Sequence, residues 1–475
     1  MGHLSLWFTL LLASTSCAAQ AVSDESFERH FTGRTLRFDY HHSGGAQEEH
    51  IALERLRLEG PWPGSRTQLV DRSNLGKYLF QVVDPATQTV IYSRGFASIF
   101  GEWETTAEAR EVWRTFEESQ RFPEPLHPVQ LVLEKRAPDG TFRELFAQLV
   151  DPSSRFVDRS PLRADSTPIV LHASGDPATK LDVLVLGDGY AQAESSKFEA
   201  DARRLVGALL DTEPFKARRG ELNVRGLCVS SPQSGISDPR RGEWRANPLG
   251  TSFNAFDSDR YVLTFANREL REVAAQAPYD ALILLCNARK YGGGGIFNLW
   301  ATCTADSSES AYVFVHEFGH SFAGLADEYY SSPVSYEEFT PPGSEPWEPN
   351  VTALLDPARV KWRDLIESST PLPTPWAKQA YDQKDLDYQK RRAEIAKSGD
   401  DAAAEALFAE VKSITGPMLA SEPFAAKVGA FEGAAYQARG LFRPQADCIM
   451  FTRSPKWFCK VCERAVSRTL DMYTH

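Results

Sequence analysis

The chain contains the stretch Val313-Phe314-Val315-His316-Glu317-Phe318-Gly319-His320-Ser321-Phe322-Ala323-Gly324-Leu325-Ala326-Asp327-Glu328, which holds the pattern His-Glu-x-x-His. On a helix, side chains four positions apart lie on the same face, so both imidazoles can reach one metal ion. Zinc in hydrolases typically takes three protein ligands and keeps a fourth position for water. Glu317 can accept the proton of that water as it attacks a carbonyl. The stretch therefore predicts an active-site helix with two metal ligands and a general base.

An ordinary amphipathic helix with surface histidines is the alternative interpretation of this stretch. Its surroundings favour the metal site. The apolar residues Val313 to Val315 suit a buried helix, and Gly319 allows another segment to approach closely. Gly324 can end the helix in a left-handed turn.

The third metal ligand must come from beyond that turn. Asp327 is eleven residues after His316. On an unbroken helix it would lie roughly 10 Å further along the axis than His320, too far to share an ion with bonds of about 2 Å. The helix must therefore break, and Gly324 is where it can. We predict Asp327 as the third ligand, because a short side chain near the turn suits a tight site, and Glu328 remains the competing candidate.

Length, charge and the amino terminus bound the class of protein. A chain of 475 residues can form two or three domains, and a net charge of -12 argues against a nucleic-acid partner. Leu4 to Ala13 is a short apolar core followed by a cleavage site at Ala19-Gln20-Ala21, which predicts a signal peptide over residues 1–21 and export to the periplasm or the extracellular space. Cys17 as a lipidated cysteine is less favoured. No later stretch has the length and apolarity of a transmembrane segment.

Six cysteines remain after Cys17. In an oxidising compartment some should pair, and Cys448 with Cys459 or Cys462 is the favoured bridge. A structural zinc site is the alternative for this carboxy-terminal trio, although three sulfurs fall short of the usual four ligands. The other cysteines are Cys228, Cys286 and Cys303.

Residues 22–165 contain short alternating apolar and polar runs separated by turn residues, the pattern of an all-β, sandwich-like domain. His41-His42 beside Gly44-Gly45 is interpreted as an exposed turn in preference to a metal site. The region holds no cluster of nucleophilic residues, so support, substrate presentation and partner binding all remain open as its role. The runs are Thr35 to Tyr40, Lys77 to Val83, Thr89 to Ser93 and Val129 to Glu134.

From residue 166 onward, strands alternate with helices, which predicts an α/β domain with a mixed, mostly parallel sheet over residues 166–475. The run Gly292 to Gly295 lacks the Gly-Lys-Ser/Thr ending of a phosphate loop, so it indicates backbone that approaches another segment closely. The segment Phe297 to Ala305 is either the edge strand along the cleft, ready to accept an extended peptide, or a flexible loop.

The last third of the chain contains an insertion and a closing segment. Prolines and a charged helical stretch, Tyr381 to Val411, predict a helical and irregular insertion over about 331–430, in which Asn350-Val351-Thr352 matches a glycosylation sequon. Trp457 to Tyr473 predicts a closing helix. Met450 in a tight turn would form an apolar floor beneath the histidines. Tyr436 is either a packed tyrosine or a hydrogen-bond donor to a developing oxyanion.

These motifs resemble the metzincin zinc peptidases and, more closely, the IgA-peptidase family of bacterial metallopeptidases, peptidase family M64. The resemblance covers residues 166–475, and the first region is similar to the β-rich amino-terminal domain that such proteins often carry. It rests on Gly187-Asp188-Gly189-Tyr190, Ala255-Phe256-Asp257-Ser258, Tyr291 to Phe297, His316 to Tyr329, Phe431-Glu432-Gly433-Ala434 and Arg443-Pro444 through Met450.

The resemblance implies one zinc ion held by His316, His320 and Asp327, with Glu317 as general base and then acid, and Met450 as the Met-turn residue. The common metzincin pattern places its glycine seven residues and a third histidine ten residues after the first histidine. Here Gly324 is at eight and Asp327 at eleven. A carboxylate thus replaces the third imidazole.

The sequence predicts a secreted or periplasmic zinc endopeptidase with a protein or peptide substrate. A zinc amidase acting on cell-wall peptide is the alternative enzyme, since the same residues would serve it. A surface-binding protein with a degenerate peptidase domain is the alternative without activity, and the intact His316, Glu317 and His320 argue against it.

Overall fold

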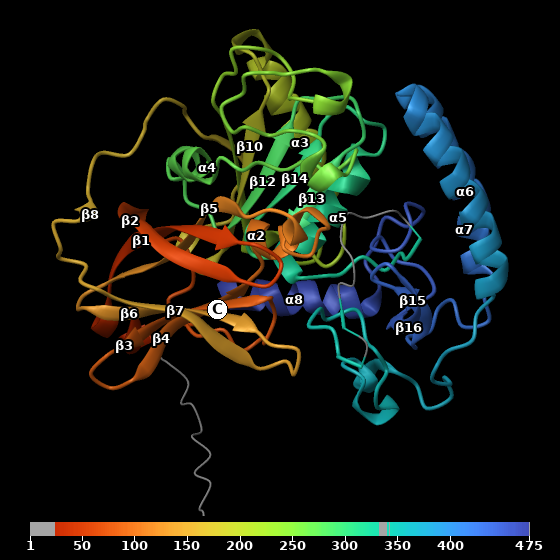
Figure 1. Cartoon of the computed structure of the whole chain (residues 1–475), viewed down its shortest axis with the longest axis horizontal. Helices are drawn as coiled ribbons and strands as arrows, with labels where there is room; N and C mark the ends of the chain where they lie inside the picture. The colour runs from red at the N-terminus through yellow and green to blue at the C-terminus, as the bar shows by residue number, and fades with distance from the viewer. Residues whose placement is uncertain (1–23, 332–339, 342, 475) are drawn as a thin grey trace, which may run out of the picture.

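The computed structural model describes residues 24–331, 340–341 and 343–474 (Figure 1). The predicted signal peptide, with Cys17, lies outside these residues, as does most of the start of the predicted insertion. The described chain forms a β-rich amino-terminal region, a mixed α/β region and a carboxy-terminal part that contains a helical hairpin. No helix in these described ranges combines the length and the apolarity needed to cross a membrane.

The amino-terminal region consists of two four-stranded sheets with the strand orders β5-β1-β2-β8 and β4-β3-β6-β7. Phe38 of β1, Phe80 of β3 and Phe122 of β5 are fully buried in a core that the two sheets share. Alternating side chains of each strand thus face this core, as the sequence pattern predicts. The elements are α1 (Asp24–His30), β1 (Phe31–Gly44), β2 (Glu49–Pro61), β3 (Tyr78–Asp84), β4 (Thr89–Phe96), α2 (Ile99–Trp103), β5 (Arg114–Pro125), β6 (Val129–Arg136), β7 (Phe142–Val150) and β8 (Val157–Asp158).

The α/β region is built on a six-stranded sheet with the order β13-β14-β12-β10-β11-β9. Strand β10 pairs in parallel with β11 and β12, and β12 pairs in parallel with β14. The two edge strands β9 and β13 are antiparallel to their neighbours. The elements are β9 (Ile169–His172), β10 (Leu181–Asp188), α3 (Ser195–Leu210), β11 (Leu222–Cys228), α4 (Asn267–Ala274), β12 (Ala281–Cys286), β13 (Gly293–Ile296), β14 (Trp300–Thr304) and α5 (Ser310–Ala323).

Every residue of β10 is buried, because both faces of the sheet are covered. Val183 and Val185 belong to a core that also contains residues of α3, α5 and the last helix. Leu184 and Leu186 point to the opposite face, where the core contains Trp103 of α2 in the amino-terminal region. The amino-terminal region is therefore packed on the sheet of the α/β region, and its position relative to the active-site helix is set by a shared core.

The predicted edge strand is wrong in its residues. The strand at this edge of the sheet is the glycine run itself, β13, whereas Phe297 to Ala305 contains β14, one strand further in. Three of the four residues of β13 are glycines. Because glycine has low β-propensity, the sequence pattern does not indicate a strand here.

The carboxy-terminal part contains two long helices, α6 and α7, where the sequence predicts a charged helical stretch. Gly399 separates them with a left-handed φ of 66°. Figure 1 shows this hairpin along the outer edge of the molecule, and a two-stranded hairpin follows it in the chain. The closing helix packs across the α/β region. The elements are α6 (Lys378–Ser398), α7 (Asp401–Ala420), β15 (Phe431–Ala434), β16 (Gln437–Arg443) and α8 (Lys460–Thr474).

Candidate metal centre and cleft

Helix α5 carries the His-Glu-x-x-His pattern and ends where the sequence predicts. Gly324 adopts a left-handed conformation with φ 61°, and its N–H donates to the carbonyl of His320 at 3.0 Å. The N–H of Leu325 donates back to the carbonyl of Gly319 at 3.3 Å. This double hydrogen bond closes the helix and reverses the chain, which a residue with a Cβ would resist.

The reversal brings Asp327 back to both histidines. Asp327 Oδ1 lies 3.0 Å from His316 Nε2 and 3.2 Å from His320 Nε2. The two Nε2 atoms are 3.1 Å apart. Glu328, the competing candidate for this position, points elsewhere and lies among cysteines. The structure thus places Asp327, and not Glu328, beside the two imidazoles.

The hydrogen bonds of the two Nδ1 atoms determine which tautomer each histidine adopts. His316 Nδ1 lies 2.9 Å from the carbonyl oxygen of Ile449, and His320 Nδ1 faces that of Leu325. Because a carbonyl oxygen only accepts, each Nδ1 carries a proton, and each Nε2 of a neutral ring is left with a lone pair. Asp327 Oδ1 is buried and has no hydrogen-bond partner in the described chain. Three acceptors therefore converge on one point, a donor set that fits a divalent cation.

The pKa shifts of His320 and Asp327 also indicate that this site requires positive charge. Burial opposes the charged form of His320, but Asp327 and Glu317 outweigh it and raise its pKa to about 9. Burial likewise opposes ionisation of Asp327, yet the two imidazoles hold its pKa well below the usual range. Protons on the imidazoles and a bound cation are the two ways to balance this carboxylate.

Glu317 lies beside the three convergent atoms. It offers an oxygen within 4.8 Å of ligand atoms on both histidines, and it lines the cleft. Burial raises the pKa of Glu317, although both histidines partly oppose the shift. A carboxylate whose pKa is raised toward neutrality suits proton transfer in both directions.

The glycine run explains how the sheet edge reaches this helix. A Cβ on Gly295 would lie 2.4 Å from the carbonyl oxygen of Glu317, and a Cβ on Gly293 would lie 2.6 Å from Val313 Cγ1. Strand β13 therefore runs directly against α5 because it lacks side chains. The prediction of a close backbone approach is confirmed.

Met450 lies beneath the turn of α5 that separates the two histidines. It is fully buried, and its sulfur is 3.2 Å from where a Cβ on Gly319 would stand. Its carbonyl accepts the N–H of Glu328 at 2.8 Å, and the preceding carbonyl, that of Ile449, faces His316. The Met450 turn thus forms an apolar floor and also orients one ring and the loop that carries Asp327.

Tyr436 stands at the tip of the β15–β16 hairpin in a left-handed conformation, φ 62°, next to Ala435 at φ 46°. Neither residue favours this conformation, so the turn is held by its surroundings. The N–H of Ala435 donates to the carbonyl of Asp327 at 2.9 Å, and that of Tyr436 to the carbonyl of Tyr329 at 3.1 Å. The Tyr436 hydroxyl donates to Asp327 Oδ2. The phenol is therefore aimed into the site, beyond what packing alone requires.

A cleft of about 380 Å³ opens over these residues. Part of its wall comes from the amino-terminal region, including Lys77, Glu102 and Arg136. Glu102 accepts a hydrogen bond from Tyr261, and burial raises its pKa to about 7. The sequence left the role of the amino-terminal region open, and the structure gives it a place along the cleft. Sequence reasoning found none of these wall residues, because only the shared core brings them to α5.

Arg260 and Tyr329 are two further cleft residues that the sequence did not single out. Arg260 Nη2 lies 3.3 Å from the Tyr329 hydroxyl, and the Tyr329 ring lies parallel to that of His316 with the centroids 6.3 Å apart. Tyr329 directly follows the acidic pair Asp327-Glu328, which was the available signal. Arg260 is a lone cation in a loop and offered none.

The interpretation of His41-His42 as an exposed turn is wrong for His42. This residue lies within β1, is buried, and its ring stacks on Phe100 with the centroids 4.0 Å apart. His42 Nδ1 lies 3.0 Å from Glu118 Oε2, and Nε2 lies 2.9 Å from Glu49 Oε2. Its carboxylate partners are far away in sequence or across a strand, so only the folded sheet brings them together.

The sequon residue Asn350 is also buried, with its side chain engaged on both sides. Its amide oxygen accepts the N–H of Ala326 at 2.8 Å, and its amide nitrogen donates to the carbonyl of Ala326 and to Glu328 Oε1. Asn350 therefore holds the loop that carries Asp327 and Glu328, which is no position for a glycan.

Two family models match the chain. One, described as IgA Peptidase M64, matches residues 169–470, and the other, described as Peptidase M64 N-terminus, matches residues 26–147. The comparison with curated proteins finds no match. The two matched segments fall on the α/β region with its carboxy-terminal part and on the β-rich region.

Proposed function

Because the chain belongs to the IgA peptidase M64 family, a family of peptidases, we propose that it is an exported, zinc-dependent endopeptidase with a metzincin-like active site. One observation carries the proposal. Three acceptor atoms, from the buried His316 and Asp327 and the partly buried His320, converge at 3.0 to 3.2 Å beside Glu317 in an open cleft. Imidazole nitrogens with one carboxylate are a donor set that zinc accepts.

A zinc ion held by these three residues would polarise the scissile carbonyl and lower the pKa of an attacking water. Glu317 would accept the proton of that water and deliver it to the leaving amine nitrogen. The carbonyl oxygens of Ile449 and Leu325 would keep the two imidazoles in the tautomer that presents Nε2 to the zinc ion. The Tyr436 hydroxyl, beside Asp327, would donate to the oxyanion that develops on the carbonyl.

The cleft supports an extended peptide as the substrate. Strand β13 is the outermost strand of its sheet and lines the cleft through Gly293, Gly294 and Gly295. The outer edge of β13 is already paired at Gly293, which bonds to Arg260 and Val262 through its backbone. A peptide laid along the rest of the strand, from Gly294 onward, would add a strand by backbone hydrogen bonds, with the missing side chains leaving room for close approach. The apolar segment Leu4 to Ala13 supports export.

The test is the substitution Glu317→Gln in the full chain. We expect it to keep the fold and the bound zinc and to lower peptide hydrolysis by about 10²- to 10⁴-fold. Glu309→Gln is the matched control, because Glu309 immediately precedes α5 and pairs with Lys412 at 3.0 Å. Full activity in the Glu317 variant would overturn the proposed role. Assays on denatured protein and on peptidoglycan, run side by side, separate the endopeptidase from a cell-wall amidase.

A further inference from the structure

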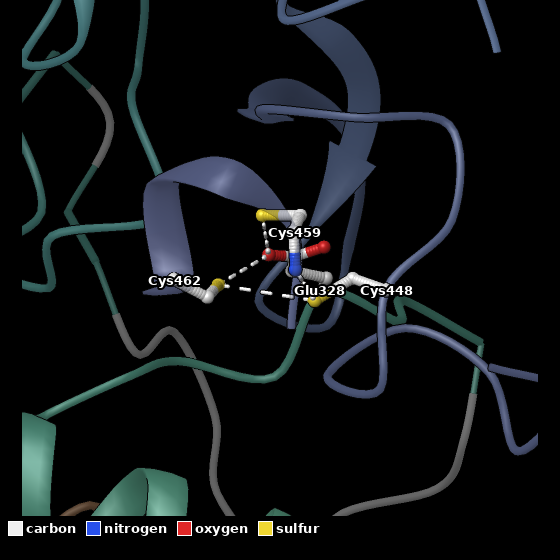
Figure 2. A group of neighbouring side chains, drawn as sticks. All are labelled: Glu328, Cys448, Cys459 and Cys462. Carbon is white, nitrogen blue, oxygen red and sulfur yellow. Dashed lines mark hydrogen bonds between the residues drawn. The ribbon is translucent and has the colours of Figure 1, made fainter. Parts of the chain in front are cut away.

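Glu328, which is not part of the proposed catalytic centre, lies among three cysteines. Glu328, Cys448, Cys459 and Cys462 are all buried, and the four ligand atoms lie within 4.8 Å of one another (Figure 2). Cys459 and Cys462 come from the start of α8, Cys448 from the Met450 turn, and Glu328 from the loop after α5. Three segments distant in sequence thus present one oxygen and three sulfurs to a single point.

The distances between these atoms fit a tetrahedral ion. A zinc ion with Zn–S bonds of about 2.3 Å has sulfurs about 3.8 Å apart, and a sulfur and a carboxylate oxygen about 3.6 Å apart. Cys448 Sγ and Cys462 Sγ are 3.9 Å apart. Glu328 Oε1 lies 3.3 Å from Cys462 Sγ and 3.9 Å from Cys459 Sγ.

Glu328 is a buried carboxylate that lacks a countercharge among the described residues. It is fully buried and forms no ion pair there, and its Oε2 has no hydrogen-bond partner. The nearby guanidinium of Arg443 donates instead to backbone carbonyls, that of Gly433 at 2.9 Å among them. An ionised carboxylate in such surroundings requires a compensating charge, and a metal ion supplies it.

The cysteines are arranged as ligands. The backbone N–H of Cys459 donates to Cys448 Sγ at 3.2 Å, a contact that stabilises negative charge on the sulfur. Cys459 immediately precedes α8 and Cys462 stands in its first turn, with the spacing Cys-x-x-Cys, where the helix dipole favours thiolates. Soft thiolate ligands in a fully buried site suit a zinc ion.

The favoured disulfide among these cysteines is not formed in the structure. All six cysteines of the described chain are free thiols, and 3.9 Å between Cys448 and Cys462 is about twice the length of an S–S bond. A disulfide would also use only two of the three sulfurs and leave Glu328 and one thiol buried without a partner. The missing fourth ligand, which made a zinc site the weaker interpretation of the sequence, is supplied by Glu328.

We propose that Glu328, Cys448, Cys459 and Cys462 bind a second, structural zinc ion that fastens the loop carrying Asp327 to the Met450 turn and to α8. Asp327 and Glu328 are adjacent, and the N–H of Glu328 bonds to the carbonyl of Met450. The loop thus supplies a residue of the proposed catalytic centre, the turn orients one, and the ion would tie both to α8.

The test is the zinc content of the purified full chain and of two sets of variants. We expect about two zinc ions per wild-type chain, about one in His316→Ala/His320→Ala, and about one in Cys459→Ser/Cys462→Ser. Cys228→Ser is the matched control, because Cys228 is half-buried outside the cluster, and it should keep both ions. X-ray absorption at the zinc edge of the His316→Ala/His320→Ala variant should show sulfur neighbours at about 2.3 Å.

This histidine variant keeps the proposal testable if the cysteine variant fails to fold. One zinc ion in the wild type with none in the histidine variant would overturn the second site. So would an intact mass that shows a native disulfide between two of the three cysteines. A wild-type chain that holds only the sulfur-bound ion and no zinc at the histidines would instead count against the proposed peptidase centre alone, so the two failures are distinguishable.

Discussion

Asp327 and Glu328 are joined by one peptide bond and belong to two clusters of opposite character. Asp327 meets two imidazoles at the bottom of a cleft, whereas Glu328 meets three thiols in a closed interior. Neighbouring side chains of an extended segment point to opposite sides, so one short loop serves both. Access to solvent separates the two clusters: the one open to the cleft suits chemistry, and the closed one suits a structural role.

Substituting Asp327→Ala should break the open cluster alone. It removes one of the three proposed zinc ligands, so we expect hydrolysis of a peptide substrate to fall by on the order of 10³-fold, because the Lewis acidity of a bound zinc ion would contribute several kcal/mol. The thermal midpoint should change little. Activity assays and thermal unfolding of the same preparation check this prediction. A large fall in the thermal midpoint beside the loss of activity would mean that the two clusters are not separate in function.

Tyr436→Phe should give the next largest effect on the open cluster. It removes the hydroxyl that donates to Asp327 Oδ2, and we expect kcat to fall by about 10²-fold, as for the loss of one oxyanion donor. Tyr388→Phe is the control, because Tyr388 is a buried tyrosine outside the cleft lining. A variant with a raised KM and unchanged kcat would show that Tyr436 contributes to substrate binding alone.

Asn350→Ala should weaken both clusters together, because Asn350 bonds to Ala326 and to Glu328. Unpaired buried groups cost about 1–3 kcal/mol, which lowers the thermal midpoint by several degrees, and we expect about a 10-fold loss of activity. Thr352→Ala also removes the sequon but leaves these contacts intact. If Thr352→Ala lost as much activity and stability as Asn350→Ala, the contacts of Asn350 to Ala326 and Glu328 would not be the cause.

The smallest effect is expected at the buried cluster around His42, where a histidine and a lysine balance the negative charge of two glutamates. His42 bonds to Glu118 and Glu49, and Lys135 also contacts Glu49. Burial opposes the charged form of His42, but the two carboxylates outweigh it and raise its pKa. Burial also opposes ionisation of Glu49, and His42 and Lys135 lower its pKa to about 2.

The signs of these shifts set a window of pH. The contribution of His42 is complete below its unfolded pKa of about 6.5 and is lost as the pH rises through the raised folded value. The contribution of Glu49 is present above its unfolded pKa of about 4.3 and is lost as the pH falls toward 2. We expect His42→Gln to flatten the decline of the thermal midpoint above about pH 6.5 by a few degrees, with chelators changing nothing at this cluster. His50→Gln, on the exposed side, should leave the profile unchanged.

The sequence was informative where spacing on one element decides the geometry. His316, Glu317 and His320 share one helix, and Gly324 ends it, so their arrangement follows from helical periodicity. Asp327 and Glu328 lie beyond that helix. The choice between them depends on the Met450 turn and the β15–β16 hairpin, more than 100 residues away, which hold the loop by backbone hydrogen bonds.

The cysteine cluster likewise depends on contacts between residues far apart in the sequence. Cys448, Cys459 and Cys462 were visible as a trio, but their fourth neighbour comes from the loop after α5 and was considered only as a catalytic ligand. The strand β13 was hidden because its place depends on missing side chains. Local patterns therefore predict the elements, while long-range contacts decide which residues of one loop serve which site.

The hairpin turn at Ala435 and Tyr436 has a consequence for how the protein can vary. Glycine or asparagine would suit the left-handed backbone at position 436, and a non-glycine residue there costs on the order of 1 kcal/mol or more. Only the tyrosine brings a hydroxyl to Asp327. Selection for heat resistance and selection for turnover therefore pull this one position toward different amino acids, and a thermostable descendant would be expected to regain its stability elsewhere.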